Sequence, residues 1–290
     1  MLNRAYSYFD RRADLAARHI ESELGVPVDR TRLISHLFIQ DLTDRLARRL
    51  PSSWVALLAT RHFSNAGDLR RAVAGSDTGI ILSVPHYGPF LWACIGAAPI
   101  LRSRGKLTIF FQDPEANAGN RIINKTLSRF FDESEICFDD RRGLARSAKA
   151  LRDGGVCILM PDATRSRDNS FLVPFLSGEF EVQPGVAALA RLTGSKIVNT
   201  YVVKESGLTY RVETSPLEMP SAVASDPEVS DYQVMCAVMA KFAELVKEKP
   251  LGWRYWHSFD RRVLFRGDAG LDTLDGDTLF SQAEKLLRFV

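Results

Sequence analysis

Cysteine is scarce in this chain, and its few thiols do not group. The 290 residues include four cysteines, with no C-x-x-C pair and no cluster of cysteine with histidine. This pattern argues against a structural zinc site and against a disulfide scaffold. Cys94 and Cys157 lie inside apolar runs, where isolated thiols serve as small core residues in a reducing compartment. We therefore expect a cytoplasmic protein.

Long hydrophobic runs are also missing. No apolar stretch reaches the length that spans a bilayer, and the first 25 residues carry charges every few positions. Such a start is neither a signal peptide nor a membrane anchor. The sequence predicts a soluble chain with at most peripheral contact at the inner membrane.

Several functional signatures are absent. The formal net charge is only +3, which does not indicate a nucleic-acid partner. There is no G-x-G-x-x-G and no glycine-rich phosphate loop, so we expect no nucleotide cofactor, and we also expect no metal. No serine lies in a G-x-S-x-G context, which gives little support to a serine hydrolase.

The residues that are present indicate an ordinary globular protein, with 46% hydrophobic and 25% charged residues. Residues 1–75 have helical periodicity throughout and are expected to pack on the core as an N-terminal helical region. From residue 76 to 265, short β-rich runs alternate with amphipathic helices. Residues 266–290 read as a Gly/Asp-rich linker and a short helix.

Apolar strands separated by helices predict an α/β fold with a mixed, mostly parallel central sheet flanked by helices. The expected strands are 78–84, 106–111, 134–138, 155–161, 171–175, 196–203 and 208–214. The expected helices are about 90–103, 117–130, 141–152, 184–193 and 229–248. Because ligands bind beyond the carboxyl ends of strands in such sheets, we expect the catalytic residues there.

The first unusual string is Pro-His-Tyr-Gly-Pro-Phe-Leu-Trp at 85–92, directly after a predicted strand. His86 stands in a turn that Gly88 tightens, and Pro89 is placed to start a helix. A rigidly held imidazole beside free helix N–H groups suits a general base. We therefore predict that His86 is catalytic and that Tyr87 and Gly88 contact substrate. The alternative is a half-buried histidine bonded to a carbonyl.

The second string is Met-Pro-Asp-Ala-Thr-Arg-Ser-Arg-Asp-Asn at 160–169, after another apolar strand. It places a carboxylate, Asp162, and two guanidinium groups, Arg165 and Arg167, at the sheet edge. Arginines in this position can hold phosphate or carboxylate in a bidentate manner. A solvated polar turn is the alternative, and it suits Arg167 better than the other two.

Together these strings resemble the lysophospholipid acyltransferase superfamily, and most closely its lipid A biosynthesis (lauroyl/myristoyl) branch. PHYGPFLW stands where the family has His-x4-Asp/Glu, and MPDATRSRDNS stands where it has a Glu/Asp-Gly-Thr-Arg-like block. The stretch FLVPFLSGEFEVQPGVAALARLTGSKIV and the later GWRYWHSF resemble the branch's following segments. The likeness covers about residues 75–262, and the order of the motifs is more specific than any one of them.

The resemblance implies acyl transfer from a thioester donor, either acyl carrier protein or coenzyme A, to an acceptor hydroxyl or amine. On this basis His86 would take the acceptor's proton, and Asp162 and Arg165 would organise the substrates. No cofactor is implied.

The family's acid should fall five residues after the histidine, but Leu91 stands there, and no Asp or Glu occurs between Asp77 and Asp113. Three explanations are open. Asp162 or Asp113 reaches His86 from another strand end, or the acceptor is a better nucleophile than a sugar hydroxyl, or the chemistry has been lost. The first two keep the enzyme active, and the third leaves a protein that binds carrier or lipid.

The start of the chain also differs from the hydrophobic helix typical of lipid A acyltransferases. The two differences together predict a soluble or carrier-bound biosynthetic intermediate as the acceptor, in place of lipid A. A lipid A-type acyltransferase and a thioesterase are the remaining alternatives.

Overall fold

The chain begins with helices, as the periodicity of its first 75 residues predicts. They are α1 (Leu2–Leu24), α2 (Arg30–Arg49), α3 (Ser52–His62) and α4 (Ala66–Ala74), with a two-residue strand β1 (Phe63–Ser64) between the last two. The structure is a computed structural model, and it describes residues 2–64, 66–74, 77–116, 118–163, 170–218 and 226–264. The predicted C-terminal helix within 266–290 lies outside the described residues.

In the described part of the chain, seven strands form the central sheet in the order β1-β9-β8-β2-β5-β3-β4. Besides β1, the strands are β2 (Ile80–Ser83), β3 (Leu107–Phe111), β4 (Ile136–Phe138), β5 (Val156–Leu159), β8 (Lys196–Ser206) and β9 (Thr209–Pro216). All neighbours are parallel except β8 and β9, which form an antiparallel hairpin. The predicted mixed, mostly parallel α/β fold is confirmed.

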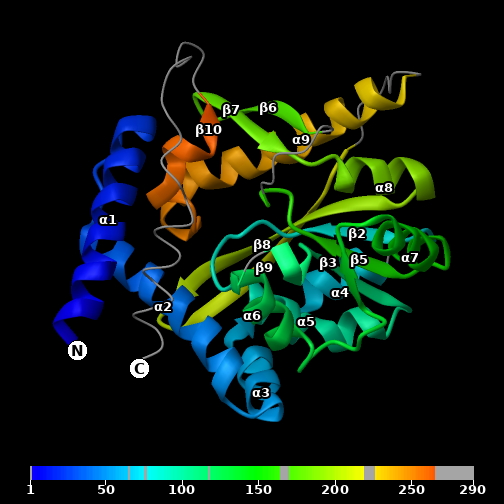
Figure 1. Cartoon of the computed structure of the whole chain (residues 1–290), viewed down its shortest axis with the longest axis horizontal. Helices are drawn as coiled ribbons and strands as arrows, with labels where there is room; N and C mark the ends of the chain where they lie inside the picture. The colour runs from blue at the N-terminus through cyan, green and yellow to red at the C-terminus, as the bar shows by residue number, and fades with distance from the viewer. Residues whose placement is uncertain are drawn as a thin grey trace.

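Helices cover both faces of this sheet (Figure 1). They are α5 (Phe90–Arg102), α6 (Ala118–Leu127), α7 (Arg141–Arg152), α8 (Gly185–Thr193) and α9 (Pro227–Glu248). Two of the starts are fixed by aspartate caps, since Asp140 accepts from the amide of Gly143 and Asp226 accepts from that of Glu228. Asp140 lies one residue before the predicted start at 141, and Asp226 lies three residues before the predicted start at about 229.

Alternation along the strands divides the core into two clusters, one on each face of the sheet. On β2, Ile81 faces the cluster that also holds α8, α9 and the inner face of α1. Ile80 and Leu82 face the other cluster, together with apolar residues of α3, α4 and α5. Strands buried on both faces explain the unbroken apolar runs in the sequence.

A second, smaller sheet was only partly predicted. It consists of β6 (Phe171–Phe175), β7 (Gly178–Val182) and β10 (Val263–Leu264), in the antiparallel order β10-β7-β6. The sequence indicates β6, but β7 was not recognised because its glutamates interrupt the apolar pattern. The hairpin turns at Leu176, whose φ is 55°. This sheet packs its inner face on α9 and on the segment that closes the functional site.

That closing segment follows α9 and contains two 3-10 helices, η2 (Pro250–Gly252) and η3 (Trp256–Arg261). It lies between α1 and the central sheet and brings residues from the end of the described chain to the carboxyl edge of β2. A short 3-10 helix, η1 (Pro114–Ala116), follows β3 at the same edge.

Candidate active site

His86 lies three residues beyond the end of β2, in the turn that leads into α5. Gly88 has φ +59°, and a Cβ there would collide with the carbonyl oxygen of Val202, so only glycine fits the turn without strain. The imidazole lies between two aromatic rings, 4.6 Å from the centroid of Phe90 and 5.0 Å from that of Tyr255. These contacts limit its rotation, while 17% of the side chain stays exposed.

Asp162 lies three residues beyond the end of β5, the strand next to β2. Its side chain is fully buried. One carboxylate oxygen, Oδ1, lies 2.9 Å from His86 Nδ1, and the backbone amide of His86 donates to both oxygens at 3.0 and 3.1 Å. This contact leaves His86 Nε2 on the opposite side of the ring, with no protein hydrogen bond among the described residues.

The electrostatics of this pair favour a charged carboxylate. Burial alone would raise the pKa of Asp162, but the charge of His86 and the two kinds of hydrogen bond it donates outweigh burial, so the pKa is lowered from its ordinary value. The charge of Arg262 acts in the same direction. Asp162 is therefore a buried anion held by donors, the arrangement that orients an imidazole.

A third donor to Asp162 comes from the closing segment. Trp253 Nε1 donates to Asp162 Oδ2 at 3.2 Å, and the indole is 1% exposed. The backbone of this segment is bonded to the histidine turn, because Gly88 donates to Gly252 and Arg254 donates to His86. Residues 86–88 and 252–254 therefore hold each other in place.

Charged groups of the closing segment surround the pair. Arg254 donates to Asp44 of α2 at 2.6 Å, and its guanidinium lies 5.5 Å from the ring centroid of Phe90. Arg262 stacks on Tyr255 with its guanidinium carbon 3.4 Å from the ring centroid. Burial raises the pKa of Tyr255, partly offset by the charge of Arg262, so the phenol beside His86 is neutral.

Tyr87, predicted to contact substrate, points away from the site. Its ring is 3% exposed in the aromatic core, and its hydroxyl donates to the carbonyl of Lys249. Its backbone forms a bridge with Trp253. The side chain thus fastens the histidine turn to the closing segment, and Gly88 contributes through its backbone shape.

Gly252 gives a stability test of this fastening. A Cβ at Gly252 would overlap the ring of Tyr87, which is buried and cannot move aside. We expect Gly252→Ala to lower the free energy of unfolding by about 1–3 kcal/mol, the usual cost of overpacking, as measured by urea denaturation. Gly185→Ala is the control, since its Cβ would meet only Leu159 Cδ2 at 3.5 Å. Equal stabilities of the two variants would contradict this packing.

The structure decides between the two carboxylates considered for His86. Asp113 is exposed, and its own side chain accepts from the amide of Glu115 in η1. Asp162 is the carboxylate that contacts the imidazole. Leu91, at the position of the expected acid, is part of α5 and is 6% exposed in the core. Arg165 and Arg167 lie outside the described residues.

Other residues near the site were missed or given only packing roles. His257 has a packing role, since its Nδ1 bonds to the carbonyl of Arg254, and burial lowers its pKa to about 3. Trp253 and Tyr255 belong to the string GWRYWHSF, from which the sequence predicts no role for either side chain. No linear pattern connects Trp253 to a carboxylate 91 residues away.

None of the described helices is both long enough and apolar enough to span a membrane. Within the same residues, no group of three or more His, Cys, Asp or Glu side chains is placed to hold a metal ion.

Comparisons with known proteins bear on the same region. The family model described as "Bacterial lipid A biosynthesis acyltransferase" matches residues 67–262, a span that contains His86, Asp162 and Trp253. Among solved structures, the chain is similar to the crystal structure of the 1-acyl-sn-glycerophosphate (LPA) acyltransferase PlsC from Thermotoga maritima. That match has 13% identity and a TM-score of 0.37, and it covers 70% of this chain and 82% of the other. No curated protein matches the chain.

Proposed function

The chain belongs to the bacterial lipid A biosynthesis acyltransferase family, and from that premise we propose that it transfers an acyl group from a thioester donor to an acceptor hydroxyl or amine, with His86 as general base. The observation that carries the proposal is the 2.9 Å contact between His86 Nδ1 and buried Asp162 Oδ1. It supplies the orienting carboxylate that the sequence lacks at Leu91.

The contact sets the tautomer of the imidazole. A buried carboxylate cannot donate when ionised, so Nδ1 carries the hydrogen and Nε2 carries the lone pair. An acceptor bound at the exposed side of the ring gives its proton to Nε2. Asp162 stabilises the positive charge that then forms on the ring.

The reaction balances with these groups alone. As the proton moves to Nε2, the acceptor oxygen or nitrogen attacks the thioester carbonyl and forms a tetrahedral intermediate. The C–S bond then breaks, and the departing sulfur takes the proton back from the imidazolium. The products are an ester or amide and a free thiol, and His86 returns to its starting state.

Because Asp162 takes the place of the missing acid, the acceptor need not be a better nucleophile than a hydroxyl. The proposed acceptor is a soluble or carrier-bound intermediate, and the proposed donor is acyl carrier protein or coenzyme A charged with an acyl chain. A lipid A precursor is the alternative acceptor.

A substrate panel tests the proposal. The protein is incubated with acyl-coenzyme A or acyl carrier protein of several chain lengths, each with an amine, a soluble hydroxyl compound or a lipid A precursor. Mass spectrometry should find an acylated acceptor formed in equal amount to the free thiol. Release of free acid at a rate independent of acceptor would indicate a thioesterase. No consumption of any thioester would contradict an active enzyme.

A further inference from the structure

Asp162 is held by a side chain from the other end of the domain as well as by His86. Resting on the function proposed above, we infer that Trp253 is a positioning residue, whose indole N–H fixes the Asp162 carboxylate in the orientation that directs His86. Family membership does not assign it this role.

The two carboxylate oxygens have different side-chain partners. Oδ1 lies against His86 Nδ1, and Oδ2 accepts from Trp253 Nε1. The backbone amide of His86 lies between them, 3.0 and 3.1 Å from the two oxygens. Rotation of the carboxylate would break the contact with Trp253 as well as the one with His86, so the three donors define one orientation.

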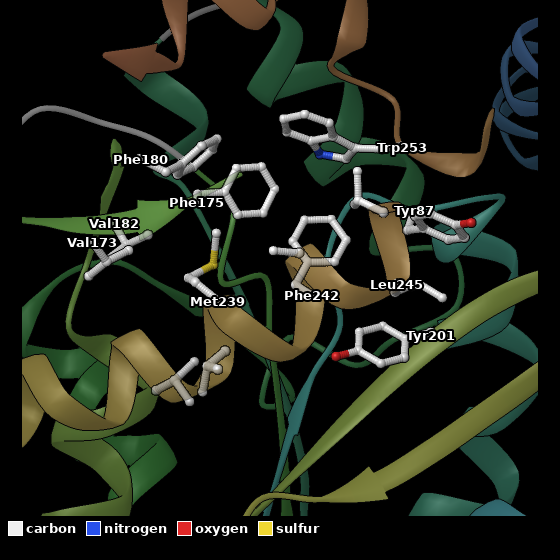
Figure 2. Packing of buried hydrophobic residues seen from close by; sticks show 14 of the residues in the cluster. Tyr87, Val173, Phe175, Phe180, Val182, Tyr201, Met239, Phe242, Leu245 and Trp253 are labelled. Atoms are coloured by element: carbon white, nitrogen blue, oxygen red, sulfur yellow. The ribbon is translucent and has the colours of Figure 1, made fainter. Parts of the chain in front are cut away.

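Trp253 is itself fixed by the aromatic core (Figure 2). Its ring centroid lies 5.2 Å from that of Phe175 and 6.0 Å from that of Phe242, with interplanar angles of 64° and 87°. The ring centroid of Trp256 lies 5.1 Å from that of Trp253. The small sheet and α9 thus hold the indole in place, and its hydrogen bond in turn restricts the orientation of the Asp162 carboxylate.

The same hydrogen bond has an electrostatic effect. A donor on Oδ2 draws negative charge from the carboxylate and weakens its attraction for an imidazolium. Removing the donor therefore favours protonated His86 and leaves less free base at a given pH. The other charged or titratable groups facing the pair are Tyr255, Arg262 and Arg254 of the closing segment. Trp253→Phe replaces none of these three side chains.

The test replaces tryptophan with phenylalanine at two neighbouring positions. Trp253→Phe removes the donor to Asp162 and keeps an aromatic ring. Trp256→Phe is the matched control, because Trp256 is equally buried and its indole donates to the carbonyl of Pro250 at 2.7 Å. Each variant loses one indole hydrogen bond, so both should lose stability.

Only Trp253→Phe should change the chemistry. We expect the acid limb of kcat/KM to move upward by about half to one pH unit, the equivalent of one hydrogen bond to a charged group. We also expect kcat to fall about tenfold with KM unchanged, because geometry at the base is disturbed and binding is not. Equal pH profiles for the two variants, shifted or not, would overturn the positioning role.

A measurement without substrate keeps this result separate from the proposed function. The spectra of ¹⁵N-labelled wild-type protein and of ¹⁵N-labelled Asp162→Asn are compared. The substitution should move the indole N–H resonance of Trp253 and leave that of Trp256 in place. The His86 ring, followed by NMR titration, should shift its midpoint upward in Trp253→Phe alone. If His86 proves dispensable for turnover while these shifts occur, the mechanism fails but the positioning stands. If neither shift occurs, the positioning role is wrong.

Discussion

Replacing His86 with alanine is expected to lower kcat/KM by about 10²–10⁴, the contribution of a positioned general base. The His86 ring is partly exposed, and its contact with Asp162 fixes its tautomer. Without it, the acceptor must lose its proton to water as it attacks the thioester. The measurement is the initial rate of thiol release with the best donor and acceptor from the panel. Donor binding should change little, because the backbone hydrogen bonds that join the turn to Asp162, Gly252 and Arg254 do not involve the imidazole.

His19→Ala is the matched control for this loss. Its Nδ1 lies 3.2 Å from Asp260 Oδ1, and its side chain is 17% exposed, the same as that of His86. His19 is part of α1 and packs on Phe259 of η3. Since it is not placed in the catalytic pair, its removal should leave the rate within about twofold. If His86→Ala and His19→Ala had equal rates, His86 would not be the base.

Replacing Asp162 with asparagine should cost up to about 10⁴ in kcat, the loss seen when an orienting aspartate is neutralised in other enzymes with this pairing. Asparagine keeps the size of the side chain and an oxygen for the amide of His86. Its NH₂ group, however, then faces Nδ1 and favours the tautomer with hydrogen on Nε2. That tautomer cannot accept the substrate's proton, so kcat falls while the fold is kept.

The control for Asp162→Asn is another buried, paired carboxylate. Asp231 on α9 is 5% exposed and accepts two hydrogen bonds from Arg191, each 2.8 Å long. Asp231→Asn should lower stability but leave the rate per folded molecule unchanged. If Asp162→Asn had normal kcat, the carboxylate would not stand in for the acid missing at Leu91.

The fold could be predicted because most strands of the central sheet are short, unbroken apolar runs with amphipathic helices between them. The small sheet shows where this fails. Its strand β7 alternates glutamate with apolar residues, and β10 is two residues long, so neither has a pattern that separates it from a loop. The inner face of the small sheet packs through Phe175 and Phe180 on Trp253, which is distant along the chain, so no local window contains these contacts.

The two members of the pair could each be located at a strand end, but the sequence left open whether Asp162 or Asp113 contacts His86. Along the chain, β3 and β4 come between β2 and β5, whereas in space β5 lies directly beside β2. Strand order is a property of the whole sheet, and it alone brings Asp162 to His86. Trp253 was missed for the same reason, since its role depends on how the closing segment returns to β2.

The most direct test of the central claim is a double-mutant cycle on kcat/KM for acyl transfer. It compares wild type, His86→Ala, Asp162→Asn and the double variant. If Asp162 acts only by orienting His86, the double variant should be about as slow as His86→Ala alone, because the carboxylate has no base left to orient. Losses that multiply, so that the double variant is slower by the product of the two single effects, would show that the two residues act independently and would contradict the account.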